Sequence, residues 1–198
     1  MATNDPRRNI LMNTLVKATE MIHPASPPTN PSPWIVRHAG LPPDQGRVLD
    51  VACGAGRNGR FFLQRGHPTV FLDIDAAKVQ DLTGVNGVEI LEIDLETNIP
   101  NAWPFEPASF AVVVATNYLW RPLMPTLIDS VAPGGVFLYE TFAIGNEAFG
   151  RPKNPDFLLK AGELLEMVRG KLRVVAFGQE TRPAPNQAVI QHIAAVRD

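Results

Sequence analysis

The stretch that decides the fold reads VLDVACGAGRNG and occupies residues 48–59. A short apolar run at its start is typical of a buried strand, and the three glycines that follow, in the spacing G-x-G-x-x-G, are typical of a tight turn into a helix. A second apolar run over residues 69–72 ends in an acid, Asp73. The segment therefore predicts a strand, a glycine turn, a helix and a second strand, the order of a βαβ unit.

The same alternation of strands and helices continues to the end of the chain. The last two apolar runs are joined by a proline-containing connection without a helix, so these two strands are expected to pair antiparallel. The whole pattern predicts an α/β fold, a Rossmann-like doubly wound sheet of seven strands in a three-layer αβα sandwich. Strands are expected over residues 47–51, 69–72, 88–93, 110–116, 135–141, 172–177 and 188–196, and helices over 56–64, 76–82, 123–131 and 162–168.

Residues 1–43 form an N-terminal helical and proline-rich extension to the main domain, which we place at residues 44–198. Apolar residues at helical spacing predict a helix over residues 9–22. Seven of the 19 prolines fall between Pro24 and Pro43, where they interrupt regular structure. A second short helix is expected to open at Trp34 and to close near Gly40.

Composition narrows the range of functions. The 198 residues carry 18 basic and 20 acidic side chains, a formal charge of −2. This balance provides no general attraction to nucleic acid or to an anionic membrane, although it leaves specific RNA contact open. The single cysteine cannot form an internal disulfide, no secretory signal is evident, and no apolar run approaches the ~18 residues of a membrane span. A cytoplasmic protein is the expectation.

The glycine turn has two candidate ligands. A dinucleotide would place its pyrophosphate at the helix start and a ribose on Asp73. Asp50, at the end of the first strand, would repel that pyrophosphate. S-adenosylmethionine has no phosphate, carries an ammonium and a sulfonium, and still offers a ribose diol to Asp73. The acid before the glycines therefore favours S-adenosylmethionine over NAD, and both over a turn that binds nothing.

These features resemble the class I S-adenosylmethionine-dependent methyltransferases over residues 44–198. Asp50, Gly54 and Gly56 match the first motif of the family, Asp73 its ribose-binding acid, and Asp94 the residue that binds the adenine amino group. The resemblance implies a strand order of 3-2-1-4-5-7-6 with strand 7 antiparallel. It also implies cofactor contacts from Asp50, Ala52, Cys53, Gly54, Gly56, Arg57, Asn58, Asp73, Ile74, Asp94, Leu95, Asn117 and Tyr118.

A narrower resemblance covers the sequence CGAGRN at residues 53–58 with the apolar and basic residues just after it. It is similar to the tellurite-resistance type of small-molecule methyltransferase. Ala52 stands where many family members have glycine, and we expect it to adopt an ordinary backbone angle. Cys53 is expected to pack in the turn and not to act as a nucleophile.

The acceptor of the methyl group should lie beyond the carboxyl ends of the strands. We expect the loop over residues 145–155 either to act as a lid, through Phe149 and Arg151, or to be a plain surface connection. Enzymes that methylate the exocyclic amines of DNA bases resemble one another in an Asn/Asp-Pro-Pro-aromatic element after the fourth strand. Residues 117–120, NYLW, differ from that element, so a base amine loses support as the acceptor. The residues expected to contact the acceptor are Trp34, Trp120, Arg121, Tyr139, Phe149, Arg151 and Arg182.

Methyl transfer is an in-line displacement, so alignment of the reactants is the main requirement. A thiolate or another soft anion needs no base, whereas a hydroxyl or a protonated amine does, and Tyr118, Glu140 and His38 are then the candidates. His192, within a strand, is expected to be a partly buried histidine with satisfied nitrogens, and His67 to be exposed. No Cys/His cluster has metal-ligand spacing.

The sequence thus predicts methyl transfer from S-adenosylmethionine to a small molecule. The alternatives are methylation of RNA or protein, a nicotinamide-dependent oxidoreductase, and an inactive module that binds the cofactor.

Overall fold

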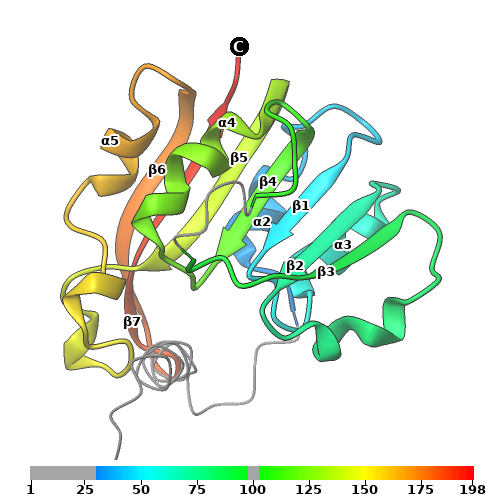
Figure 1. The fold of residues 1–198 in the computed structure, drawn as a ribbon. Helices are drawn as coiled ribbons and strands as arrows, with labels where there is room; N and C mark the ends of the chain where they lie inside the picture. The colour runs from blue at the N-terminus through cyan, green and yellow to red at the C-terminus, as the bar shows by residue number, and fades with distance from the viewer. Residues whose placement is uncertain (1–29, 98–102) are drawn as a thin grey trace, which may run out of the picture.

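The computed structural model describes residues 30–97 and 103–198, which form one α/β unit (Figure 1). The helix predicted over residues 9–22 lies outside the described residues. Within them, a seven-stranded sheet has the order β3-β2-β1-β4-β5-β7-β6. β7 pairs antiparallel with both β5 and β6, and the other pairings are parallel. The predicted fold class and strand order are confirmed.

The strands agree closely with the prediction except at the start of β5 and the end of β6. β5 begins four residues earlier than expected, and β6 extends to Arg182 because it pairs with β7 along its whole length, from Arg173 opposite Val196 to Arg182 opposite Ala188. The strands are β1 (Val48–Val51), β2 (Thr69–Asp73), β3 (Val88–Glu92), β4 (Phe110–Thr116), β5 (Val131–Phe142), β6 (Arg173–Arg182) and β7 (Ala188–Val196).

The helices are short. The segment expected as a helix over residues 76–82 is a 3₁₀ helix, and the one expected over 123–131 ends at Asp129, because Val131 already begins β5. No helix in the described part of the chain is long and apolar enough to cross a membrane. The helices are α2 (Pro33–His38), α3 (Arg57–Gln64), α4 (Met124–Asp129) and α5 (Glu163–Val168), with 3₁₀ turns η1 (Ala76–Leu82), η2 (Arg121–Leu123), η3 (Asn146–Ala148) and η4 (Pro155–Phe157).

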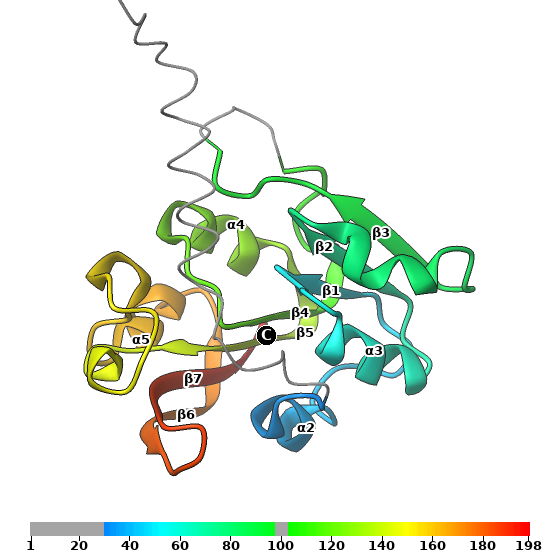
Figure 2. The ribbon, with the colours of Figure 1, turned by 90° about the horizontal axis from the view of Figure 1, so that it is seen from below.

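The helices cover the sheet from both sides. Successive residues of a strand point to opposite faces, and each face of this sheet has its own apolar cluster. α4 and α5 lie on one face, and α2 and α3 on the other (Figure 2). Ile35 of α2 is fully buried against the second face, so the described end of the N-terminal extension is part of the core.

The glycine turn contains one strained residue. Ala52 has a φ of 49°, in the left-handed region, between β1 and the glycines. The expectation of an ordinary backbone angle at Ala52 is therefore wrong. The turn requires this angle because the chain reverses there from strand to helix, and a side chain at such a position costs about 1–2 kcal/mol.

We expect Ala52→Gly to raise the free energy of unfolding by up to about 1 kcal/mol. The relief of the left-handed strain exceeds the ~0.4–1 kcal/mol that glycine costs through the unfolded chain. Urea denaturation measures the difference. Ala77→Gly, at an exposed residue of η1 with no positive φ, serves as the control and should lower stability. A loss of stability in Ala52→Gly equal to that of the control would contradict the assignment of strain.

Candidate functional site

The glycine turn is held from inside by Asp50. Its side chain is 1% exposed, and its Oδ2 accepts a hydrogen bond from the backbone N–H of Gly59 at 2.7 Å, within the first turn of α3. Gly59 and Gly56 pack on Phe71: an added Cβ would lie 2.4 and 2.8 Å from its ring. Asp50 and these two glycines therefore join β1 and α3. This structural role was not part of the prediction, which gave Asp50 and Gly56 only a contact with the cofactor.

The other side of the turn is open. An added Cβ on Gly54 would meet no atom within 4 Å. The N–H of Gly54 donates to Asp73 Oδ2 at 2.7 Å, and the N–H of Asp75 donates to Asp73 Oδ1 at 3.0 Å. Ile74, directly after Asp73, is 47% exposed despite its apolar side chain. The Asp73 carboxylate thus lies beside the open space over Gly54 and the exposed apolar side chain of Ile74.

Further predicted cofactor residues follow β3 and β4 at the same edge of the sheet. Asp94 Oδ1 accepts from the N–H of Glu96 at 2.9 Å, and Leu95 is half-buried against the core. Asn117 adopts a φ of 59° at the end of β4. Tyr118 is 5% exposed, and its hydroxyl has no hydrogen-bond partner among the described residues.

Tyr118 is unsuited to the role of base. Burial in the first place, and then nearby carboxylates such as Glu96, raise the pKa of its hydroxyl above the ordinary value. The phenol therefore stays protonated and can only donate a hydrogen bond to a ligand or accept one.

Arg57 and Asn58 are engaged with the chain itself. Arg57 Nη1 donates to the carbonyl oxygen of Asn30 at 3.1 Å, and Asn58 Oδ1 accepts from the N–H of Ser32 at 3.0 Å. Both side chains also donate to Thr116 Oγ1 at the end of β4, at 3.3 and 3.0 Å. The two residues that were expected to contact the cofactor thus fasten the segment before α2 to the edge of the sheet.

A second polar group surrounds Glu140 of β5, which is 2% exposed. Its Oε1 accepts from Ser32 Oγ at 3.1 Å and pairs with Arg182 Nη2 at 2.6 Å, while its Oε2 lies 3.8 Å from His192 Nδ1. Burial alone would raise the pKa of Glu140, but His192, Arg182 and Ser32 together outweigh it and lower the pKa. Glu140 is therefore an ionised carboxylate and a poor proton acceptor, unlike the base that the sequence suggested.

His192 is fixed by its neighbours on two sides. Its ring stacks on Trp34, with centroids 3.8 Å apart and planes at 16°, and Trp34 Nε1 donates to the carbonyl oxygen of Ile193 at 3.1 Å. On β6, an added Cβ at Gly178 would lie 2.3 Å from His192 Nε2, so the ring occupies the space that this glycine leaves. The Nδ1 is buried without a hydrogen-bond partner in the described chain, which overturns the expectation of satisfied nitrogens.

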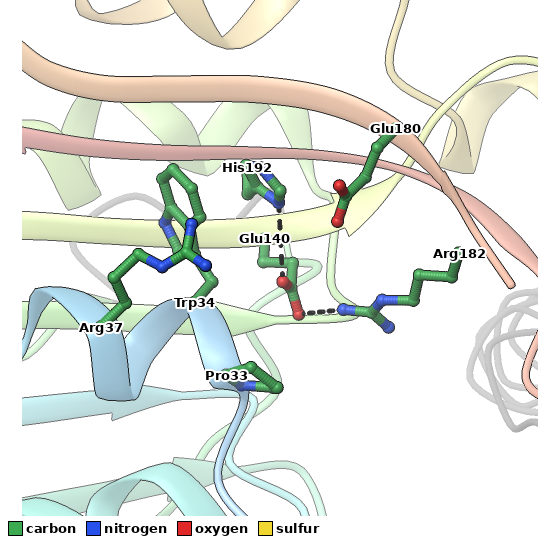
Figure 3. A pocket seen from close by; sticks show the side chains of 7 residues that line it. All are labelled: Pro33, Trp34, Arg37, Glu140, Glu180, Arg182 and His192. Atoms are coloured by element: carbon green, nitrogen blue, oxygen red, sulfur yellow. Dashed lines mark ion pairs between the residues drawn. The ribbon is translucent and has the colours of Figure 1, made fainter.

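These residues enclose a cavity of about 160 Å³ (Figure 3). Three of the predicted site residues meet there: Trp34, Glu140 and Arg182. His38 does not line the cavity; its Nδ1 lies 3.0 Å from the carbonyl oxygen of Trp34. The cavity is lined by Pro33, Trp34, Arg37, Glu140, Glu180, Arg182 and His192, of which sequence reasoning missed Pro33, Arg37, Glu180 and the role of His192.

Two residues expected to contact the acceptor are instead structural. Tyr139 is fully buried, and its hydroxyl donates to the carbonyl oxygen of Tyr118. Arg121 donates to both carboxylate oxygens of Glu163, at 2.6 and 3.0 Å, and to the carbonyl oxygen of Asp156 at 2.6 Å. Both side chains are thus committed to contacts within the protein.

Other predicted acceptor residues lie apart from the cavity. Trp120 is half-buried against the core, and Phe149, 42% exposed, and Arg151 do not line the cavity. Their loop is anchored by Asn146, whose Nδ2 donates to the carbonyl oxygen of Pro152 and whose Oδ1 accepts from the N–H of Val189. The lid stays a prediction.

Two further residues are buried. Cys53 packs with Phe71 and Val79 as expected, and burial raises the pKa of its thiol, so it is unreactive. His67 was expected to be exposed, but it is 5% exposed and its Nδ1 lies 2.8 Å from the carbonyl oxygen of Gly46. Its turn packs on the core instead of projecting into solvent.

The sequence and fold of the chain were compared with those of known proteins. Residues 48–135, from β1 to the early part of β5, match the family model of a methyltransferase domain. The match spans less than half of the chain and indicates a methyltransferase domain in that segment. A curated relative, ribosomal protein L11 methyltransferase of Bordetella parapertussis, is 38% identical over 97 residues, which cover 47% of this chain and 30% of the relative. The chain thus spans less than a third of that relative's length.

Solved structures share the fold of the methyltransferase domain. TehB from Haemophilus influenzae matches with a TM-score of 0.64 and 16% identity, over 83% of this chain and 61% of TehB. The 1,6-didemethyltoxoflavin-N1-methyltransferase from Burkholderia thailandensis, solved with S-adenosylhomocysteine bound, matches with a TM-score of 0.62 and 17% identity, over 100% of this chain and 93% of that one. These structures confirm the predicted fold, and the match over residues 48–135 supports the predicted domain family.

The residues around the turn fit the predicted cofactor, S-adenosylmethionine. The space over Gly54 leaves room for a ligand against the backbone, and Asp73 retains lone pairs for a pair of hydroxyls. The exposed Ile74 offers an apolar surface to a flat ring, and the unpartnered hydroxyl of Tyr118 offers a donor. All of these features are present in the structure without any rearrangement of the backbone.

The pKa of Asp50 gives the methyltransferase domain a pH-dependent stability. Burial raises it from 3.8 to about 7, against the smaller opposing effects of the Gly59 N–H and Arg57. Between pH 3.8 and about 7, Asp50 keeps its proton in the folded protein and loses it in the unfolded chain. The stability that this group contributes is therefore fully present below pH 3.8 and is lost as the pH rises to about 7.

We expect the free energy of unfolding of the wild type, minus that of Asp50→Asn, to fall as the pH rises from 4 to 8. The asparagine keeps an oxygen for the Gly59 N–H but cannot ionise. Urea denaturation at intervals of one pH unit measures the difference. Asp44→Asn, at an exposed residue, is the control and should give a flat difference. A flat difference for Asp50→Asn as well would contradict the raised pKa.

Proposed function

We propose that this chain transfers a methyl group from S-adenosylmethionine to a small-molecule acceptor held in the cavity beside Trp34. The observation that carries the proposal is the cavity itself, with its polar lining and a volume of about 160 Å³. Ligand pockets for drug-sized molecules usually measure about 300–1,000 Å³. A cavity of this size suits a small molecule or one chemical group.

The position of the cavity relative to the glycine turn supports the proposal. Thr116, which receives Arg57 and Asn58 from the start of α3, lies opposite Glu140 in the pairing of β4 with β5. The cavity and the turn are therefore neighbours at the carboxyl edge of the sheet, where ligands bind in open α/β folds. This is the arrangement that transfer between two bound molecules requires.

The work of the chain is to bind and align. S-adenosylmethionine supplies a methyl group already activated by a sulfonium, so no covalent enzyme intermediate is needed. We assign Asp73 to the ribose hydroxyls, Asp94 to the adenine amino group and Ile74 to the adenine face. Trp34 and Pro33 line the acceptor side and would hold the acceptor in position.

A methyl-transfer assay tests the acceptor class. We expect radiolabel from S-adenosyl-[methyl-³H]methionine to appear in at least one member of a panel of small alcohols, amines, thiols and carboxylates, with tellurite included. Ribosomal protein L11 and total RNA should stay unlabelled, because the small-molecule proposal takes the cavity to hold a whole acceptor molecule. Labelling of L11 or RNA alone would refute the small-molecule proposal while leaving methyl transfer intact.

Protein methylation is the second candidate, and the ribosomal protein L11 methyltransferase relative favours it. A single side chain of a protein could enter the cavity, but its main chain would have to lie over α2.

The NAD-dependent alternative is tested by calorimetry, in which we expect S-adenosylhomocysteine to bind and NAD not to bind.

We expect Asp73→Asn to weaken the binding of S-adenosylhomocysteine about tenfold or more. A hydrogen bond to a charged group contributes about 1.5–3 kcal/mol, and the amide keeps the shape of the side chain but not the charge. Isothermal titration calorimetry measures the change. Asp129→Asn, on α4 at the other face of the sheet, is the matched control and should bind as the wild type does. Equal affinities in both variants would remove Asp73 from the ribose site.

A further inference from the structure

Two polar atoms face each other in the cavity without a hydrogen bond between them. Glu140 Oε1 is occupied by Ser32 Oγ and Arg182 Nη2. Glu140 Oε2 faces His192 Nδ1 at 3.8 Å, which exceeds hydrogen-bond distance, and this Nδ1 has no other partner in the described chain. A buried polar atom left without a partner is unfavourable, so the gap is a place for a ligand atom.

The gap is held open by the packing of the imidazole. Trp34 stacks on one face of the His192 ring, and the ring fills the space over Gly178. Arg182 and Ser32 fix the carboxylate of Glu140 from its other oxygen. Figure 3 shows the two groups directed toward each other across the gap, with their ion pair drawn as a dashed line.

The charges around the gap select the kind of group that fits it. Glu140 is an ionised carboxylate, and Glu180 adds a second one to the lining. An anion in the gap would lie against both carboxylates. In the tautomer of His192 that carries its proton on Nε2, Nδ1 is an acceptor, and a single donor group can then bind both facing atoms. A hydroxyl or an ammonium group supplies one.

We propose that Glu140 Oε2 and His192 Nδ1 together bind a hydroxyl or ammonium group of the acceptor molecule. This assignment rests on the proposed function, because it takes the cavity to be the acceptor site. It makes His192 an acceptor-binding residue and gives the buried Glu140 a role in specificity. Arg37 and Arg182, also in the lining, would instead attract a carboxylate, and the experiment distinguishes the two.

The experiment uses three probes with the same propyl chain: propylammonium, 1-propanol and propionate. Each is titrated into the full chain saturated with S-adenosylhomocysteine, and the ring ¹⁵N resonances of His192 and the indole N–H of Trp34 are followed by NMR. We expect propylammonium and 1-propanol to shift the His192 resonances. Propylammonium should bind at least tenfold more tightly than propionate.

Two variants test the same assignment. Glu140→Gln should lower the affinity for propylammonium at least tenfold, whereas Glu180→Gln, which removes the same charge from the lining but no atom of the gap, should lower it by a clearly smaller factor. Gly178→Ala places a Cβ on the His192 ring and should also weaken binding at least tenfold, with Glu140 and Arg182 untouched. The comparison of probes on the wild type stands even if Glu140→Gln does not fold.

The inference is overturned if propionate binds as well as propylammonium, or if propylammonium and 1-propanol leave the His192 resonances unmoved. It is also overturned if Glu140→Gln folds and binds propylammonium as the wild type does. Calorimetry on the same wild-type sample keeps the proposed function separate. Absence of S-adenosylhomocysteine binding there would refute the proposed function, whatever the probes do.

Discussion

The buried carboxylate of Glu140 imposes the strongest constraint on the site. Removal of an ionised group from water costs several kcal/mol, and only close opposite charges and hydrogen bonds offset this cost. For Glu140 they come from Ser32 before α2, Arg182 at the end of β6 and His192 on β7. Three segments far apart in the sequence must therefore meet at the end of β5.

That meeting explains features that otherwise look unrelated. β6 and β7 form a long hairpin that reaches to Arg182, well past the core of the sheet. The chain before α2 is fastened at Ser32, which also donates its N–H to Asn58 at the start of α3. The compensation of one charge thus joins the last hairpin and α2 at the cavity, and Ser32 links both to the start of α3.

The fold was predictable because its signals are local. Apolar runs of strand length, glycines at 54, 56 and 59, and prolines between elements predicted nearly all boundaries of the strands, whereas their order in the sheet was implied by the resemblance to a methyltransferase family. The errors occurred where a neighbour overrides the local pattern. β6 is extended by its pairing with β7, and Ala52 is driven to a positive φ by the turn that the glycines require.

The site was predictable only in part, because side-chain partners depend on the register between strands. Tyr139 and Glu140 are adjacent in β5 but point to opposite faces, so one is core and the other lines the cavity. Alternation along each strand places Asp50, Thr116, Glu140 and His192 on the α2 and α3 face. That shared face was a signal in the sequence, but the pairing of Glu140 with His192 needed the structure.

The composition of the cavity wall affects how this enzyme could diverge. α2 has six residues and contributes three of the seven lining residues, Pro33, Trp34 and Arg37. The residues that we propose to bind the cofactor lie on other elements, at the glycine turn and the ends of β2 and β3. On the proposed function, substitutions in one short helix would therefore change acceptor preference and leave the proposed cofactor site intact, so α2 is the natural place to engineer selectivity.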